Sequence, residues 1–247
     1  MYQTWNTPEI TYSRLYADML NQHHVLIAGA TGSGKSVVIN GIIHAALKDS
    51  PARVGLILID PKRVELAPYA NLQHTIAHAK GFDPKAWIAA LTQAVNIMDA
   101  RYTEMERKHQ RIYAGRDIYV IIDEWANVYK NGGAACYKAV MRLTSEGRAA
   151  KVHVIMATQV PKANVIPTEI RENFTARLCL RCNTKAESRV LMDVAGCEEL
   201  PQYGYGYYIT PLGKYLYELP MIEETELQRV IDHWMTTRPR RRLFRAG

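Results

Sequence analysis

The chain has 247 residues and a formal net charge of +7, with 48% hydrophobic and 22% charged residues. This length supports one large domain with a substantial core, and the composition is that of a soluble globular protein. No apolar run reaches the roughly eighteen residues of a membrane span, and the N-terminal MYQTWNTPEI lacks a signal-peptide pattern. We therefore expect a cytoplasmic protein without membrane contact.

Short apolar strands and amphipathic helices alternate along the chain after an amphipathic stretch near residues 11–20. Continuous apolar runs predict strands at residues 24–30, 54–60, 118–124, 152–159 and 176–182. Apolar residues at helical spacing predict helices at residues 36–47, 83–112, 134–147, 185–194 and 225–234.

A β-hairpin is predicted near the C-terminal end, where residues 203–210 and 214–220 flank the turn formed by Pro211, Leu212 and Gly213. Strands that alternate with helices predict an α/β fold with a mostly parallel central sheet flanked by helices. In such sheets ligands bind at the carboxyl ends of the strands. The residues directly after each apolar run are therefore the first candidates for a functional site.

The first predicted strand runs into GATGSGKS, Gly29 to Ser36, which fits the phosphate-loop pattern G-x-x-x-x-G-K-[ST]. Glycines let backbone N–H groups close around phosphates, and the following helix adds a field that favours negative charge. In this pattern Lys35 reaches the β and γ phosphates, and the Ser36 hydroxyl coordinates Mg²⁺. The residues predicted to contact a nucleotide are Gly29, Ala30, Thr31, Gly32, Ser33, Gly34, Lys35, Ser36 and Val37.

Two acidic residues, Asp123 and Glu124, follow the apolar run IYVII. An aspartate in this place can hold Mg²⁺ through water, and the glutamate after it can act as the base toward an attacking water. The alternative is an acidic pair that only marks the end of a strand, but the phosphate loop favours the catalytic interpretation. The Asp60-Pro61-Lys62 segment and Glu65 lie after another strand, where spacing alone indicates a structural or relay role.

Two polar residues bracket the apolar strand within SEGRAAKVHVIMATQ, residues 145–159. Gln159 ends the strand at the expected catalytic edge, where its amide can touch the γ-phosphate and the attacking water. Arg148 precedes the strand and belongs near the other end of the sheet, because a strand of this length spans roughly 20 Å. We therefore expect Arg148 to reach the nucleotide of a neighbouring subunit, as an arginine finger does. The alternative is that both residues only solvate the ends of the strand.

Two further patterns favour a structural role in packing over a catalytic or ligand-binding role. Cys179 and Cys182 form a CxxC, but they lie in a predicted strand without a second CxxC, so we expect reduced, structural cysteines. Tyr203, Tyr205 and Tyr207 alternate along one strand, which is typical of packing on a sheet face, although stacking on adenine is the alternative.

A series of motifs in this chain resembles, in order, the motor domain of FtsK/SpoIIIE-type DNA translocases. The motifs are HVLIAGATGSGKSVVINGII, LILIDPKRVEL, VIIDEWANV, GRAAKVHVIMATQVP, IRENFTARL and KAESRVLMDVAGCEEL. The resemblance covers roughly residues 23–210 and implies a RecA-like P-loop core, a homo-hexameric ring, and ATP-driven movement along double-stranded DNA. It divides the chain into an N-terminal extension (1–22), a motor domain (23–220), and a C-terminal helix with a basic tail (221–247).

The resemblance also assigns roles to single residues. It implies that Lys35 and Ser36 bind phosphate and Mg²⁺, that Asp123 and Glu124 are the Mg²⁺ ligand and the base, that Gln159 is a sensor, and that Arg148 acts in trans. Basic residues of the family's pore correspond to Arg171 and Lys185. A third pore position, directly after ATQ, is Val160 here, so we expect Lys162 to take its place.

The leading hypothesis is an ATP-hydrolysing translocase of duplex DNA, with ATP as its one small-molecule substrate. The lack of room for membrane helices or a winged-helix domain suggests a minimal motor from a phage or mobile element. The alternatives are a packaging or conjugative coupling ATPase, a type VII-like protein-secretion ATPase, and a monomeric nucleotide switch. Arg171, Lys185 and the basic segment RPRRRLFR, residues 238–245, favour DNA, although such a tail is equally typical of a solubilising end.

Overall fold

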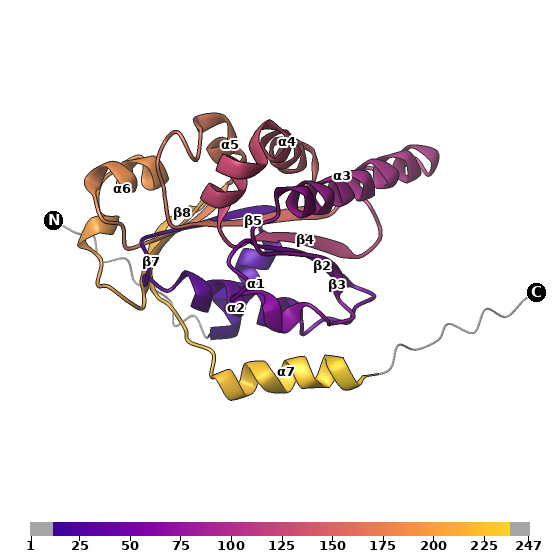
Figure 1. The fold of residues 1–247 in the computed structure, drawn as a ribbon, viewed down its shortest axis with the longest axis horizontal. Coiled ribbons are helices and arrows are strands. Elements are labelled where there is room, and N and C mark those ends of the chain that lie inside the picture. The colour runs from indigo at the N-terminus through magenta and orange to yellow at the C-terminus, as the bar shows by residue number, and fades with distance from the viewer. Residues whose placement is uncertain (1–11, 238–247) are drawn as a thin grey trace, which may run out of the picture.

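The computed structural model describes residues 12–237, and its core is one eight-stranded sheet (Figure 1). The strands are β1 (His24–Ala28), β2 (Val54–Asp60), β3 (Thr75–Lys80), β4 (Asp117–Ile122), β5 (Val152–Thr158), β6 (Ala176–Leu180), β7 (Tyr205–Thr210) and β8 (Gly213–Glu218). Their order across the sheet is β3-β2-β4-β5-β1-β6-β7-β8. The strands from β3 to β6 run parallel, and β7 pairs antiparallel with both β6 and β8.

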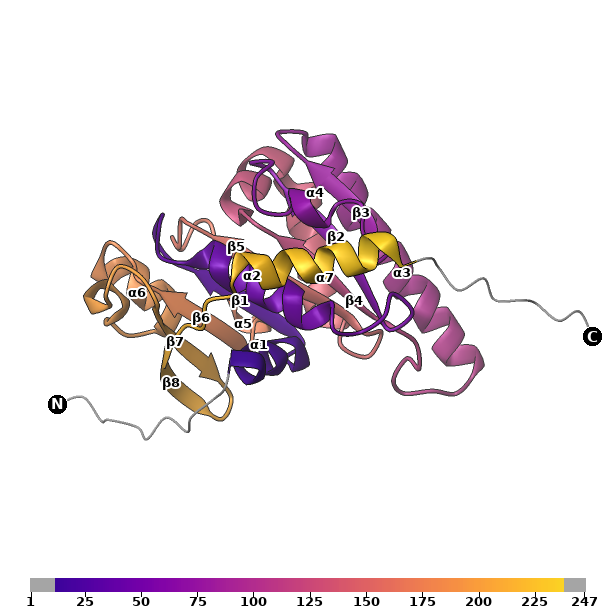
Figure 2. The same ribbon diagram turned by 90° about the horizontal axis from the view of Figure 1, so that it is seen from below.

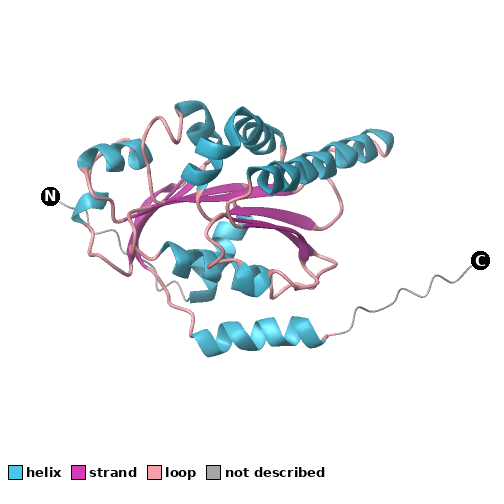
Figure 3. Ribbon diagram, viewed as in Figure 1, coloured by secondary structure: helices cyan, strands magenta, loops and turns pink. Residues whose placement is uncertain are grey.

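Helices cover both faces of this sheet, so that the strands form a single layer between them (Figure 3). The helices are α1 (Tyr12–Asn21), α2 (Lys35–Ala46), α3 (Pro84–Arg107), α4 (Trp125–Glu146), α5 (Thr168–Asn173), α6 (Lys185–Met192) and α7 (Glu224–Thr236). The helices α3 to α6 lie on one face, and α1, α2 and α7 lie on the other (Figure 1). Each face has its own hydrophobic cluster, because β1, β2, β4 and β5 are apolar on both sides.

The predicted α/β fold and the hairpin of β7 and β8 are confirmed. One strand, β3, and one short α-helix, α5, escaped prediction, as did the 3-10 turns Ala67–Tyr69 and Cys197–Glu199. The helix α4 begins at Trp125 rather than near residue 134. Gly133, with a φ of 58°, interrupts α4 and separates its first turns from its second part. The predicted helix corresponds to that second part. The edge strand β3 is mostly half-buried, so it lacks the continuous apolar run of the central strands.

The helix α7 packs along the outer side of α2 (Figure 2). Trp234 donates its indole N–H to the carbonyl of Leu47 at 2.8 Å, and Ile231 is buried beneath the helix. Glu226 lies 3.4 Å from the Nε2 atom of His44. The basic segment 238–245 and residues 1–11 lie outside the described residues, so a nucleic-acid role of that segment stays a prediction.

The four cysteines are free thiols and all four are buried, as expected of structural residues. Burial raises the pKa of the Cys136 thiol to about 11, which disfavours its reactive thiolate form. Among residues 12–237, no helix is long and apolar enough to cross a membrane.

Candidate active site

The carboxyl ends of β1, β2, β4 and β5 lie side by side and bring four loops to one edge of the sheet. Ala28 of β1 is in register with Thr158 of β5, and the Gly29 N–H donates to the Thr158 carbonyl at 3.3 Å. On the other side of β5, Asp123 continues from β4, and its N–H donates to the carbonyl of Ile59 at 3.1 Å. The phosphate loop, the acidic pair and Gln159 therefore meet at the edge where the sequence placed them.

The loop from Gly29 to Ser36 has the backbone shape of an anion-binding turn. Gly32 and Gly34 adopt φ angles of 75° and 100°, which side-chain-bearing residues rarely adopt. The helix α2 begins directly after Gly34, and no side chain caps its first N–H groups. The Ser33 hydroxyl is buried without a hydrogen-bond partner. Unpaired donors at a helix N-terminus suit a phosphate group, so the residues fit a bound nucleotide.

Lys35 is held inside this loop. Its ammonium donates to the carbonyls of Gly29 at 2.7 Å and of Ala30 at 2.9 Å, and the residue is 6% exposed. Burial lowers the pKa of Lys35 to about 8, and the nearby Glu124 opposes that change. Phosphate oxygens beside the ammonium would raise this pKa again, because an opposite charge stabilises the protonated form.

Glu124 is fixed by three contacts from two other loops. Its Oε1 atom accepts from the Thr158 hydroxyl at 2.8 Å and from the Gln159 N–H at 3.1 Å. The ammonium of Lys62 lies 3.5 Å from the Oε2 atom, and the Glu124 side chain is 4% exposed. A carboxylate held in one orientation at the edge of a phosphate loop is suited to accept a proton from a water molecule.

The surroundings of Asp123 fit a hard cation such as Mg²⁺. Burial, together with the neighbouring carboxylates of Asp60 and Glu65, raises the pKa of Asp123 to about 7. The Ser36 hydroxyl donates to Glu65 at 2.6 Å, so it lies within the same group of oxygen atoms. Among the described residues, no cluster of three or more His, Cys, Asp or Glu forms a ready cation cage. Mg²⁺ rarely uses such a cage, since it binds one or two protein oxygens together with nucleotide phosphates.

The loop after β2 supplies contacts that the sequence did not define. The Asp60 carboxylate accepts from the backbone N–H groups of Lys62, Arg63 and Leu66 at 3.0, 2.8 and 3.1 Å. This turn presents Lys62 to Glu124 and Glu65 to Ser36. Lys62 and Glu65 therefore touch Glu124 and the Ser36 hydroxyl of the phosphate loop, and a structural or relay role of this segment stays a prediction.

The two polar residues that bracket β5 lie at opposite ends of the strand. The Oε1 atom of Gln159 accepts from the Thr31 hydroxyl at 3.1 Å, which places the amide against the phosphate loop. Arg148 is exposed at the other end, next to His23, whose pKa is lowered by burial and by the Arg148 charge. The seven residues of β5 separate them, a distance of roughly 20 Å. Arg148 therefore cannot serve the phosphate loop of its own chain.

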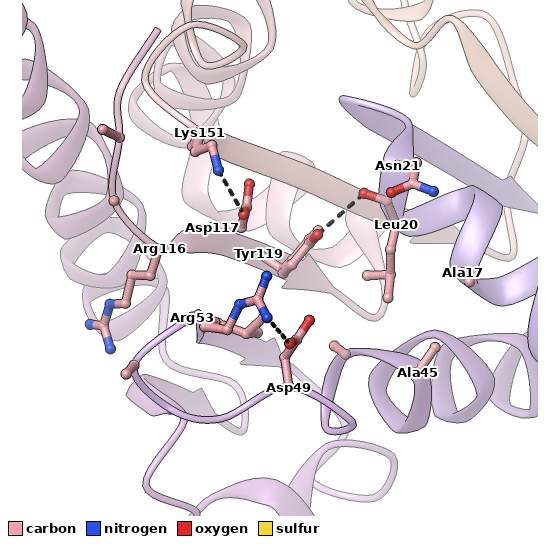
Figure 4. Close-up of a pocket in the computed structure, with 15 residues that line it drawn as sticks. Ala17, Leu20, Asn21, Ala45, Asp49, Arg53, Arg116, Asp117, Tyr119 and Lys151 are labelled. Atoms are coloured by element: carbon pink, nitrogen blue, oxygen red, sulfur yellow. Dashed lines mark hydrogen bonds and ion pairs between the residues drawn. The ribbon is translucent and has the colours of Figure 1, made fainter.

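A cavity of about 560 Å³ opens at the amino-terminal ends of β2 and β4, the end of the sheet at which Arg148 lies. Figure 4 shows the residues that line it. Four of its charged groups form two ion pairs, Lys151 with Asp117 at 3.2 Å and Arg53 with Asp49 at 3.5 Å, and the Arg116 guanidinium donates to the carbonyl of Pro51 at 3.1 Å. The Tyr119 hydroxyl donates to the carbonyl of Leu20 at 3.2 Å. These polar groups already have partners, so the cavity offers few free contacts to a ligand.

The predicted DNA contacts differ in their surroundings. Lys162 and Lys185 are exposed, and Val160 is half-buried. The guanidinium of Arg171 instead donates to the carbonyl of Val190 and lies 3.4 Å from Asp193, with its side chain 18% exposed. The structure thus gives Arg171 an internal partner, and contact with DNA stays a prediction for all three cations.

A phosphate loop after β1, an acidic pair after β4 and a glutamine after β5, on one edge of a mostly parallel sheet, define a RecA-like P-loop NTPase. The chain belongs to the FtsK/SpoIIIE family, whose profile matches residues 6–199. This confirms the resemblance seen in the motifs.

Similar proteins agree with this assignment. The chain is 33% identical over 240 residues to the DNA translocase FtsK of Helicobacter pylori, covering 91% of this chain and 28% of that protein. It is 32% identical over 250 residues to the DNA translocase SpoIIIE of Bacillus subtilis, covering 92% of this chain and 32% of that protein. The pCW3 conjugation coupling protein TcpA, solved with ATPγS, shares the fold with a TM-score of 0.74 at 20% identity, over 87% of this chain and 66% of that chain. The chain thus spans about a third or less of the length of the FtsK and SpoIIIE proteins.

Proposed function

We propose that this chain is an ATP-hydrolysing motor that moves along double-stranded DNA as part of a homo-hexameric ring in the cytoplasm. The observation that carries the proposal is the meeting of Lys35, Ser36, Asp123 and Glu124 at one edge of the sheet, in a chain of the FtsK/SpoIIIE family. The similar proteins FtsK and SpoIIIE are DNA translocases, which supports DNA as the partner of this chain.

In the proposed reaction, the amides of the phosphate loop and the ammonium of Lys35 bind the phosphates of ATP. Ser36 and Asp123 would hold Mg²⁺, which would offset negative charge on the phosphates. Glu124 accepts the proton of the attacking water, and Lys62, Thr158 and Gln159 keep its carboxylate in place. The Gln159 amide lies against Thr31 of the phosphate loop and is suited to sense the loss of the γ-phosphate.

Arg148 completes the site of a neighbouring subunit in this proposal. It is exposed and lies at the far end of β5 from its own phosphate loop, so its guanidinium can reach a nucleotide only in another molecule. Mixing Arg148→Ala subunits with Lys35→Ala subunits tests the assignment. Partial recovery of ATPase activity in the mixture is expected, because some interfaces then combine an intact loop with an intact arginine. No recovery at any ratio contradicts a role in trans.

The test of the DNA motor is ATPase activity with and without duplex DNA across a salt series. Stimulation is expected at low salt, with DNA affinity falling steeply as salt rises, because phosphate contacts release counterions. Lys162→Ala and Lys185→Ala should each weaken DNA binding uniformly across sequences.

A protein-secretion ATPase is the second candidate, and the internal pairing of Arg171 favours it, since only two of the three predicted pore cations are then exposed. ATP hydrolysis that duplex DNA does not stimulate at low salt supports this second candidate over the first.

A further inference from the structure

One large aromatic side chain lies exposed beside the phosphate loop. The Cε1 atom of Tyr203 is 3.8 Å from the position that a Cβ atom on Gly32 would occupy. Tyr203 is nevertheless 64% exposed, so it contributes little to the core. An aromatic ring held at the rim of a nucleotide site presents an apolar face to whatever binds there.

The neighbouring tyrosines are used differently. Tyr205 and Tyr207 pack partly against the hydrophobic core, and the ammonium of Lys214 lies 4.3 Å above the Tyr207 ring. Tyr208 is 2% exposed, and its hydroxyl donates to Asp18 at 3.0 Å. The packing interpretation of the alternating tyrosines therefore holds for Tyr205 and Tyr207, and Tyr203 is left for another role.

The segment that carries Tyr203 is connected to the phosphate loop by short hydrogen bonds. The Ala30 N–H of the loop donates to the carbonyl of Arg181 at 2.7 Å, and the Arg181 guanidinium donates to the carbonyl of Leu200 at 2.9 Å. Beyond Tyr203, the carbonyl of Gly204 accepts from the Leu219 N–H at 2.6 Å. Contacts on both sides thus limit the movement of residues 200–204 relative to the loop.

We propose that Tyr203 is the platform on which the base of the bound nucleotide stacks. This inference rests on the proposed function, because it requires a nucleotide whose phosphates occupy the loop from Gly29 to Ser36. Apart from Lys35, that loop offers only backbone and small side chains around the phosphates, so the base must lie outside it. A flat aromatic ring next to Gly32 matches the flat face of a purine, and stacking needs no hydrogen bond to the base.

The proposal predicts which part of the ligand feels a change at Tyr203. Truncating a ring that stacks on a base weakens binding about tenfold, whereas binding of the phosphates alone is unaffected. Stacking by a bare ring also tolerates different bases, so ATP and GTP analogues should lose affinity by similar factors. The phenol oxygen is dispensable in this role, and Tyr203→Phe should bind as the original chain does.

The experiment measures the dissociation constants of ATPγS and of inorganic tripolyphosphate, both with Mg²⁺, by isothermal titration calorimetry. The variants are Tyr203→Ala and Tyr203→Phe, and the control is Leu212→Ala, an 89% exposed residue in the turn of the same hairpin. The expected result is an about tenfold weaker ATPγS affinity for Tyr203→Ala alone, with unchanged tripolyphosphate affinity. Recovery by Tyr203→Phe shows that the effect comes from the ring.

Three outcomes would overturn the inference. Unchanged ATPγS affinity in Tyr203→Ala means that the ring does not contact the nucleotide. Equal losses for ATPγS and tripolyphosphate mean that Tyr203 acts on the shape of the phosphate loop and not on the base. If the original chain binds neither ligand, the proposed nucleotide site is wrong and this inference is wrong with it. The first two outcomes differ from this one, because in both of them the original chain still binds ATPγS.

Discussion

Replacing Asp123 by asparagine is expected to stabilise the nucleotide-free protein, although it removes a proposed Mg²⁺ ligand. Asp123 is 7% exposed, and burial with the nearby carboxylates of Asp60 and Glu65 raises the pKa of its carboxyl from 3.8 to about 7. A carboxyl with a raised pKa binds its proton more tightly in the folded chain than in the unfolded chain. The free energy of unfolding therefore falls as the pH rises from about 4 to about 7, and it stays low above that range.

The size of the effect follows from the same pKa. The interval between 3.8 and about 7 corresponds to about 4 kcal/mol at most, because each unit is worth about 1.4 kcal/mol. Local relaxation and water around the carboxylate reduce such a penalty, so we expect about 2 kcal/mol. Asparagine keeps the shape of the side chain and carries no charge, so Asp123→Asn should be more stable by about that amount at about pH 8.

Urea unfolding with a chelator at about pH 8 and about pH 4.5 measures this difference. The gain in Asp123→Asn should shrink at the lower pH, where the native aspartate is largely protonated in the folded chain. Asp232→Asn, at an exposed position of α7, is the matched control for exchanging an aspartate for an asparagine. Equal stability of Asp123→Asn and the original chain at both pH values would refute the reasoning that the loops after β2 and β4 crowd their carboxylates.

Three further predictions concern the contacts around the site and the fold. Lys62→Gln should lower kcat about fivefold with ATPγS affinity retained, because a partly exposed ion pair contributes about 1 kcal/mol, and Lys62→Arg should keep most of the activity in the same assay. Glu124→Gln should lower kcat at least about a hundredfold in steady-state ATPase measurements while calorimetry still detects ATP binding. Trp234→Ala should lower the free energy of unfolding by about 2 kcal/mol in urea, since α7 loses its hydrogen bond to Leu47, and an unchanged value contradicts the docking of that helix.

The parts of this protein that sequence reasoning predicted are those governed by local chemistry. Apolar runs predicted the buried strands because both faces of each central strand lie in the core. The glycines of the phosphate loop predicted its backbone shape, since Gly32 and Gly34 need positive φ angles that other residues rarely adopt. The Asp83-Pro84 pair predicted the start of α3, where the Asp83 carboxylate accepts from two backbone N–H groups.

The parts that sequence reasoning missed depend on contacts between distant segments. Ser36 and Glu65 are 29 residues apart, and Lys62 and Glu124 follow different strands, so spacing along the chain contained no signal for either pair. Arg171 matched a family position for DNA contact, but its surroundings are set by Val190 and Asp193 in and after α6. Tyr203 differs from Tyr205 and Tyr207 only through the path of the chain past the phosphate loop.

The strand β5 determines how the two ends of the proposed catalytic unit can communicate. All seven of its residues are buried, and it pairs in parallel with β1 on one side and β4 on the other. Such a strand cannot slip by one residue, because every side chain would then move to the opposite face of the sheet. Gln159 and Arg148 therefore move as parts of one body. In the proposed ring, a displacement of Gln159 on ATP hydrolysis moves Arg148 by rotating the whole subunit. The coupling between the two residues therefore depends on the contacts between subunits more than on the stiffness of β5.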